Sequence, residues 1–375
     1  MRSMPAGTRL VTLCLATFAA CTGGGGTDPD PVDVDGGTTP TPDAADPGKD
    51  GGPSTDASPD APPMVEELPP LGDGVGTLSG ASVAGRIDGI RGIARFSNPV
   101  NVVSDGAGGV VVCDFDNHSL RRVDADGAAS SPFTLPATFA RPFGIVRSGD
   151  TLYVQTDRST TGTPTGALWR ITLSTGTATL VRDNVGRYRG LALLSDGRLV
   201  GAEYQQHVVS ILDPSTGVAT VLAGAAGQAG MLDATGAAAR FDMPYDVVVL
   251  PGDEIVVADF GNDLLRKVSL DGSVVTYASG FTTPQGLALG AGGTIYVSDP
   301  EAGVVKAVAS GGGAVTTVAG TGTRGYLDAE NPLEAQLFGL EGLDVSADGA
   351  YLYVADGSGG EDLPYHRVRR LTIAP

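Results

Sequence analysis

The sequence predicts an all-β fold, a six-bladed β-propeller built from four-stranded antiparallel blades. Short apolar runs such as "GVVVCD", "EIVVAD" and "TIYVSD" are separated by Gly, Asp and Ser, as in strands joined by tight turns. The 375 residues include 56 glycines and 25 prolines, and no helical period of apolar residues is visible. One plan of about 40 residues recurs six times, which favours a propeller.

The repeat is seen when the copies are aligned two residues after a recurrent proline. This column contains Asn101, Gly144, Gly190, Asp246, Gly286 and Gly342. Glycine-rich loops lengthen some of the units, as in "AGAAGQAGMLDATGAAARF" and "AGTGTRGYLDA". The shorter units keep the same apolar runs, so the strands of the six units are equivalent.

Each unit contains four strands in order, illustrated by the fourth unit. Its strands are expected at 245–250, 254–259, 264–270 and 273–278, with Gly- and Asp-rich hairpin turns between them. The last unit ends at its third strand, "HRVRRLTI", whereas residues 75–84 match a fourth strand that no unit precedes. We therefore expect the N-terminal strand to complete the last blade and to cover its edge.

The first unit carries "CDFDNHSLRRV", with Asn117, His118 and Leu120, and the fourth carries "ADFGNDLLRKV". These motifs resemble those of NHL-repeat propellers, and the resemblance covers residues 75 to about 373. The long glycine-rich loops are similar to those of bacterial NHL-repeat proteins. Neither the Gly-His and Trp-Asp pairs of WD40 repeats nor the paired glycines of kelch repeats recur.

The N-terminal region divides into an export signal and a tether. Residues 1–21 have two arginines, an apolar run and "FAAC", which resembles a bacterial lipobox that directs lipidation of Cys21. The alternative is an ordinary signal peptide cleaved near Ala20. Residues 22–71 are acidic, rich in Pro, Gly and Thr, and lack aromatic residues, so we expect a disordered tether. The propeller is then expected over 72–375, anchored by lipid to the bacterial envelope, with the outer membrane as the expected location.

Charge and cysteine content narrow the range of partners. The formal net charge is −19, shared about equally between the tether and the repeats, which argues against nucleic acid and against an anionic membrane as partners of the propeller. We expect contact with the membrane through the lipid anchor only, and a monomer. Cys113 is the one cysteine within the repeats, so it is expected to be a buried thiol.

The candidate ligand-binding residues lie at the mouth of the expected channel. The first strand of each blade should line this channel, and polar residues replace the common glycine at Asn101 and Asp246. The preceding column contributes Arg189, Tyr245, Gln285 and Glu341. Polar groups that converge on a concavity are typical of a ligand site. The alternative is that they hydrate the channel and cap backbone groups.

These observations predict a non-enzymatic protein that presents a binding face to a protein or glycan partner at the cell envelope. No catalytic residue, metal ligand or cofactor is assigned. The alternative function is a metal-assisted hydrolase or lyase similar to gluconolactonase, with a cation such as Ca²⁺ in the channel. Four of the six glycine-column positions offer no side chain, so few cation ligands are visible.

Three recurrent polar columns are interpreted as structural. Acidic residues end the second strand of five units and are expected to cap the following turn; they are Asp114, Glu203, Asp259, Asp299 and Asp356. Asp88, Asp233 and Asp328 close the long loops and are expected to set turns rather than to bind calcium. His118, His207 and His366 fall on different units and are expected to lie too far apart to share a zinc ion.

Overall fold

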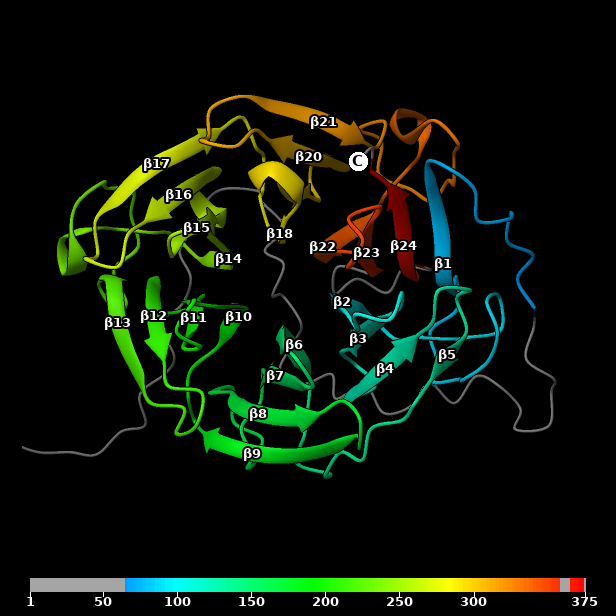
Figure 1. Ribbon diagram of the computed structural model, residues 1–375, viewed down its shortest axis with the longest axis horizontal. Helices are drawn as coiled ribbons and strands as arrows, with labels where there is room; N and C mark the ends of the chain where they lie inside the picture. Colours follow the sequence, from blue (N-terminus) through cyan, green and yellow to red (C-terminus); the bar gives the residue numbers. More distant parts are fainter. Residues whose placement is uncertain (1–64, 358–364, 374–375) are drawn as a thin grey trace, which may run out of the picture. The chain divides into compact units, whose positions relative to one another are not determined.

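The protein is described from a computed structural model, which places residues 65–357 and 365–373. Six four-stranded antiparallel sheets stand around a common axis, so the six-bladed propeller is confirmed (Figure 1). The described residues contain no helix long and apolar enough to cross a membrane. The predicted signal peptide, Cys21 and the tether up to residue 64 lie outside the described residues.

Each blade is numbered in chain order, and its strands run from the axis outward. Blade 1 contains β2 (Pro99–Ser104), β3 (Val110–Asp114), β4 (Ser119–Val123) and β5 (Ala129–Ser130). Blade 2 contains β6 (Pro142–Ser148), β7 (Thr151–Thr156), β8 (Ala167–Thr172) and β9 (Thr177–Asp183). Blade 3 contains β10 (Tyr188–Leu193), β11 (Leu199–Glu203), β12 (Val208–Leu212) and β13 (Ala219–Gly224).

The second half of the ring repeats this order. Blade 4 contains β14 (Pro244–Leu250), β15 (Glu254–Asp259), β16 (Leu264–Val268) and β17 (Val274–Ser279). Blade 5 contains β18 (Leu287–Leu289), β19 (Ile295–Asp299), β20 (Val304–Val308) and β21 (Val315–Ala319). Blade 6 contains β22 (Gly339–Val345), β23 (Tyr351–Gly357), β24 (His366–Thr372) and β1 (Val75–Ala81). Short 3-10 turns occur at η1 (Gly236–Ala238), η2 (Phe260–Asn262), η3 (Ala291–Gly293) and η4 (Pro332–Glu334).

Burial decreases from the axis to the rim. All six residues of β2 and all five of β3 are buried, whereas most residues of the outer strands β9 and β13 are at least partly exposed. Continuous apolar runs therefore mark the two-sided inner strands, which pack against neighbouring blades on both faces. Cys113 lies on β3, is fully buried and is not in a disulfide, as predicted.

The first described strand pairs with the last. β1 is antiparallel to β24, with Val75 opposite Leu371 and Ala81 opposite His366, and in Figure 1 the two strands lie side by side. This is the pairing expected for the orphan strand.

Ordered contacts begin before residue 72, where the sequence placed the start of the propeller. The Glu66 carboxylate accepts hydrogen bonds from Ser82 N at 2.9 Å and from Arg367 Nη2 at 2.6 Å, and Glu66 N donates to Gly92 O at 2.9 Å. Leu71 packs against the apolar cluster between blades 6 and 1. The end of the acidic segment is thus held by specific ion pairing that its composition does not reveal.

The propeller has two ends along its axis, which we call the proline end and the turn end. The proline end is where the innermost strands begin, as at Pro99, Pro142 and Pro244. The turn end is the opposite one, which carries the hairpin turns between the first and second strands of each blade, such as β2–β3 and β6–β7.

Candidate functional site

The glycine column lies where neighbouring innermost strands approach most closely. A Cβ atom at Gly190 would lie 2.1 Å from Asp246 Oδ1, and a Cβ atom at Gly342 would lie 1.9 Å from Asn101 Oδ1. The side chains of Asn101 and Asp246 therefore extend over the glycine of the preceding blade. The column is glycine because the space above it is already filled, at these two places by a neighbour's polar side chain.

The innermost strands surround a channel cavity of 230 Å³, and its walls are mostly Val, Leu, Ile and Ala. Its polar lining comes from Asn101, Asp246 and Asp344. Asp344 was missed by the sequence analysis. It follows Gly342 by two residues and so faces the same side of its strand, which is a signal that the internal alignment contains.

Both channel carboxylates connect one blade to the next. Asp246 on β14 accepts from its neighbour Val247 N and from Leu287 N of blade 5, each at 2.8 Å. Asp344 on β22 accepts from Val345 N at 2.9 Å and from Ser104 N of blade 1 at 2.7 Å. Asp246 therefore accepts hydrogen bonds from backbone donors of two blades, a structural role in addition to the predicted ligand-binding one.

These carboxylates are held in an environment that disfavours their charge. The pKa of Asp246 is raised to about 7, mainly by burial and least by the nearby Asp344, while the two backbone hydrogen bonds act in the opposite direction. Burial also raises the pKa of Asp344 to about 6, while its backbone hydrogen bonds and then Arg147 act in the opposite direction. Near neutral pH, the channel thus contains carboxyl groups that are partly protonated.

The other four candidates meet at the proline end of the axis, where all are at least nine-tenths buried. Tyr245 Oη of blade 4 donates to Glu341 Oε2 of blade 6 at 3.1 Å. The Tyr245 ring lies 5.7 Å from the ring of Phe143 of blade 2, centroid to centroid. The Arg189 guanidinium of blade 3 lies 4.0 Å from the Phe143 centroid and 3.2 Å from the Asp157 carboxylate.

Gln285 of blade 5 belongs to the same column, and its amide oxygen has no hydrogen-bond partner among the described residues. We call Arg189, Tyr245, Gln285 and Glu341 the proline-end cluster. The column was predicted to ring the channel mouth, and the structure brings side chains from four blades to that end. They are, however, buried and partly paired with one another or with Asp157, rather than exposed on a rim.

Of the five acidic residues that end second strands, Glu203 accepts a backbone hydrogen bond from Gln206 N of its own following turn, as expected. The four aspartates of this column instead accept backbone hydrogen bonds from the segment before the innermost strand. Asp259 accepts from Asp242 N at 2.7 Å, before β14, and from Asn262 Nδ2 at 2.9 Å. It also pairs with Arg266 Nη1 on β16 at 2.8 Å, and both side chains are 0% exposed. The backbone donor comes from the segment before the innermost strand, so this residue ties together two strands and a loop rather than capping its own turn.

The long-loop aspartates complete the same arrangement. Asp233 pairs with the second amino group of Arg266 and accepts from Thr276 N of β17 at 3.0 Å. Blades 1 and 6 repeat this clasp, an arginine held between a loop aspartate and a strand aspartate, as Asp88–Arg121–Asp114 and Asp328–Arg369–Asp356. The loop aspartates therefore hold the long loops against the blades through ion pairs with buried arginines. This role is neither the setting of a turn nor the binding of calcium.

Two of the three histidines each accept a backbone hydrogen bond from the segment that leads into the next blade. His207 Nδ1 accepts from Met243 N at 3.0 Å, and His366 Nδ1 accepts from Asn98 N at 3.1 Å. Both donors precede a proline and have positive φ, 47° and 52°. Burial lowers the pKa of His366 to about 4, with a smaller contribution from Arg367. A neutral imidazole thus joins one blade to the start of the next.

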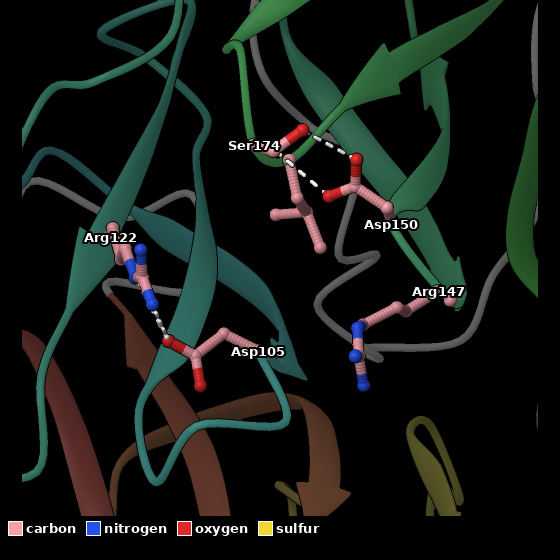
Figure 2. Close-up of a pocket in the computed structure, with 7 residues that line it drawn as sticks. Asp105, Arg122, Arg147, Asp150 and Ser174 are labelled. Carbon is pink, nitrogen blue, oxygen red and sulfur yellow. Dashed lines mark hydrogen bonds and ion pairs between the residues drawn. The ribbon is translucent and has the colours of Figure 1, made fainter.

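A second hollow, of 260 Å³, lies at the turn end between blades 1 and 2 (Figure 2). The side chains that line it are Asp105, Arg122, Arg147, Asp150, Leu173 and Ser174. Arg122 makes a two-point ion pair with Asp105, with Nε at 2.9 Å and Nη2 at 2.8 Å from Oδ2. Asp150 accepts from Ser174 N at 2.9 Å and from Ser174 Oγ at 2.5 Å. None of the residues that line this hollow was among the predicted site residues.

No protein-family model matches this chain, and no curated protein matches it. Solved structures do. A Bacteroides thetaiotaomicron VPI-5482 protein of unknown function superimposes with a TM-score of 0.62 at 16% identity, covering 80% of this chain and 75% of the other. For an auxiliary nutrient-binding protein from Bacteroides ovatus ATCC 8483 the TM-score is 0.59 at 16% identity, with coverages of 79% and 75%. For a gluconolactonase from Xanthomonas campestris it is 0.55 at 15% identity, with coverages of 80% and 89%. At this identity the likeness extends to the propeller fold alone.

Proposed function

We propose that this chain is an exported NHL-like propeller that binds a protein or glycan partner without catalysing a reaction. The proline-end cluster is the proposed binding site, and lipidation at Cys21 is the proposed anchor to the envelope. The NHL label is supported by "CDFDNHSLRRV" and "ADFGNDLLRKV". The printed description of one structural neighbour as nutrient-binding is compatible with this reading.

The observation that carries the proposal is the convergence of polar side chains from separate blades on one end of the axis. The bond from Tyr245 to Glu341 spans blades 4 and 6, and Arg189 of blade 3 stacks on Phe143 of blade 2. Buried polar groups are costly unless they are paired. In blade 1 the same column holds Val100, so the scaffold accepts an apolar residue there. A network of this kind, which the repeat does not require, is what a binding site needs.

The alternative, a cation in the channel that assists hydrolysis, fits these residues poorly. Ca²⁺ takes six to eight oxygen ligands. The channel offers side-chain oxygens from Asn101, Asp246 and Asp344, and these already accept backbone N–H groups. Among the residues that the structure describes, no group of three or more His, Cys, Asp or Glu side chains is placed to hold a metal ion. Metal analysis of the purified protein tests this alternative directly.

The binding proposal is tested with Tyr245→Phe, which removes one hydroxyl and keeps the ring that packs on Phe143. Binding to immobilised envelope glycans and to envelope proteins should weaken about tenfold, as expected for one lost buried hydrogen bond. The matched control is Tyr277→Phe on β17, because the buried Tyr277 hydroxyl has no hydrogen-bond partner in the described structure. Equal binding by both variants would show that the proline-end cluster is not the site.

The anchor is tested separately with Cys21→Ser. This change removes the thiol to which lipid would be attached, so fatty-acid labelling should be lost and the protein should move to the soluble fraction. Retention of the Cys21→Ser variant in the membrane at the wild-type level would refute the anchor while leaving the binding proposal unaffected.

A further inference from the structure

The hollow at the turn end contains Arg147, whose positive charge lowers the pKa of Asp344 without forming a direct ion pair with it. Among residues 65–357 and 365–373, Arg147 makes no hydrogen bond or ion pair, and its Nε atom is buried without a partner. In Figure 2 dashed lines join Arg122 to Asp105 and Ser174 to Asp150, and none reaches Arg147. A partly buried guanidinium without an acceptor is unfavourable, so its position calls for an explanation.

The scaffold does not require this arginine, as the other blades show. The equivalent position, three residues after the glycine column, is occupied in the other innermost strands by Ser104, Leu193, Val249, Leu289 and Val345. Blade 2 alone has a charged residue there. Comparison of the six blades thus shows that the fold tolerates uncharged residues at this position. The charged residue occurs only in the blade whose innermost strand lines this hollow.

The position of the guanidinium favours a flat anionic group. The guanidinium lies against Gly106, where a Cβ atom would be 2.5 Å from Nη1 and 2.6 Å from Nη2. The planar, forked donors of arginine pair best with a carboxylate or a phosphate, through two parallel hydrogen bonds. Asp105 and Asp150 also line the hollow. Their negative charges repel a phosphate, which carries about 1.5 to 2 negative charges at pH 7, more strongly than they repel a carboxylate, which carries one.

The remaining walls suit hydroxyl groups. Ser174 and the Asp105–Arg122 pair can exchange hydrogen bonds with hydroxyls, and Leu173 offers an apolar surface. A volume of 260 Å³ is small for a drug-sized ligand and suits a single sugar ring. We propose that this hollow is a second binding site, separate from the proline-end cluster, in which Arg147 pairs with the carboxylate of a sugar acid the size of a monosaccharide.

The test is calorimetric titration of the folded full-length protein with glucuronate, glucose, acetate and inorganic phosphate. Glucuronate should bind with a Kd of about 1 mM, which is ordinary for so small a ligand. Glucose lacks the carboxylate and acetate lacks the hydroxyls, so each should bind at least tenfold more weakly. Phosphate should also bind more weakly, because of the two aspartates.

The key variant is Arg147→Leu, which installs the residue found in β10 and β18. It should keep the melting temperature within a few degrees and lose glucuronate binding by tenfold or more. Arg170→Leu, an exposed arginine on β8 of the same blade, controls for the change in net charge and should bind as the wild type does. Tyr245→Phe should also bind glucuronate normally, which separates this site from the proposed function.

Three results would overturn the inference. The absence of heat when glucuronate is titrated into the wild type would show that Arg147 forms no glucuronate site. Equal binding of glucuronate by the wild type and the Arg147→Leu variant would show that any site does not use Arg147. Binding of acetate or phosphate as tight as that of glucuronate would show a general anion site and refute the sugar-acid ligand.

Discussion

Removing the arginine from the clasp of blade 4 should destabilise the propeller strongly at neutral pH. Arg266 and Asp259 are both 0% exposed, and their charged atoms are 2.8 Å apart. Arg266→Met would leave the Asp259 carboxylate buried without its cation. Breaking a buried pair in this way costs about 3–5 kcal/mol of unfolding free energy.

Blade 2 shows how the penalty can be avoided. At the equivalent positions it has Thr156 and Trp169, joined by a hydrogen bond of 3.3 Å from the indole Nε1 to the threonine Oγ1. Trp169 packs on Phe139 as Arg266 packs on Phe241. The double variant Asp259→Thr with Arg266→Trp should therefore cost less than Arg266→Met alone, because no buried charge is left unpaired.

The pH dependence provides an independent check. Burial raises the pKa of Asp259 to about 6 even beside Arg266. A carboxyl group whose pKa is raised on folding contributes most to stability at low pH, and this contribution is lost as the pH rises from about 4 to about 6. Without Arg266 the pKa should rise further, so the penalty of Arg266→Met should shrink at pH 5, where Asp259 is protonated.

The assay is urea unfolding followed by circular dichroism, at pH 7.5 and pH 5. It compares the wild type, Arg266→Met, the single variants Asp259→Thr and Arg266→Trp, and the double variant that combines the last two. The reasoning predicts strong non-additivity between the two positions. It would be refuted if Arg266→Met cost less than about 1 kcal/mol at pH 7.5, if the costs of the single changes simply added, or if the penalty grew at pH 5.

Three further predictions concern the joints between blades. Deleting residues 22–84 should lower the melting temperature far more than deleting 22–64, because it removes β1 and exposes β24; equal melting would mean that β1 is dispensable. Asp246→Gly should be less stable than the wild type at pH 5 by about 1–2 kcal/mol. This difference in unfolding free energy should close by pH 8, because the raised pKa of Asp246 reduces wild-type stability as the pH rises through 7. A difference that widens with pH would contradict this. Burial lowers the pKa of His366 to about 4, so the contribution of His366 to the free energy of unfolding is full above pH 6.5 and falls on acidification. Between pH 7 and pH 5 the wild type should therefore lose about 2 kcal/mol more unfolding free energy than His366→Gln, as measured by urea unfolding. Equal losses in the two proteins would show that His366 does not titrate in this way.

Strand order and number were predictable because they depend on local patterns. Apolar runs such as "EIVVAD" end at Asp-Gly or Gly turns, and the six copies align on one column. The same alignment located Arg189, Tyr245 and Glu341 at one end of the axis. It could also have exposed Asp344 and Arg147, since each is a polar exception in a column of mostly apolar residues.

The partners of each charged residue could not be predicted, because they are determined by contacts between distant segments. Asp259 meets Arg266 across a strand pair, and that arginine then meets Asp233 from the preceding loop. The carboxylate of Asp246 reaches a backbone donor in the next blade. A sequence column shows that an aspartate recurs, whereas only the packed blades show which donors it faces.

Because β1 pairs with β24, the ring of blades does not depend on which blade contains the two ends of the chain. Because Val75 lies opposite Leu371, the first and last described segments end beside each other. A short peptide linking them, with new termini opened at an exposed turn such as that after Gly252, should give a circularly permuted protein with the same blades. In such a permutant β1 and β24 would be joined as an ordinary hairpin, and the break in the chain would lie in whichever blade received the new ends.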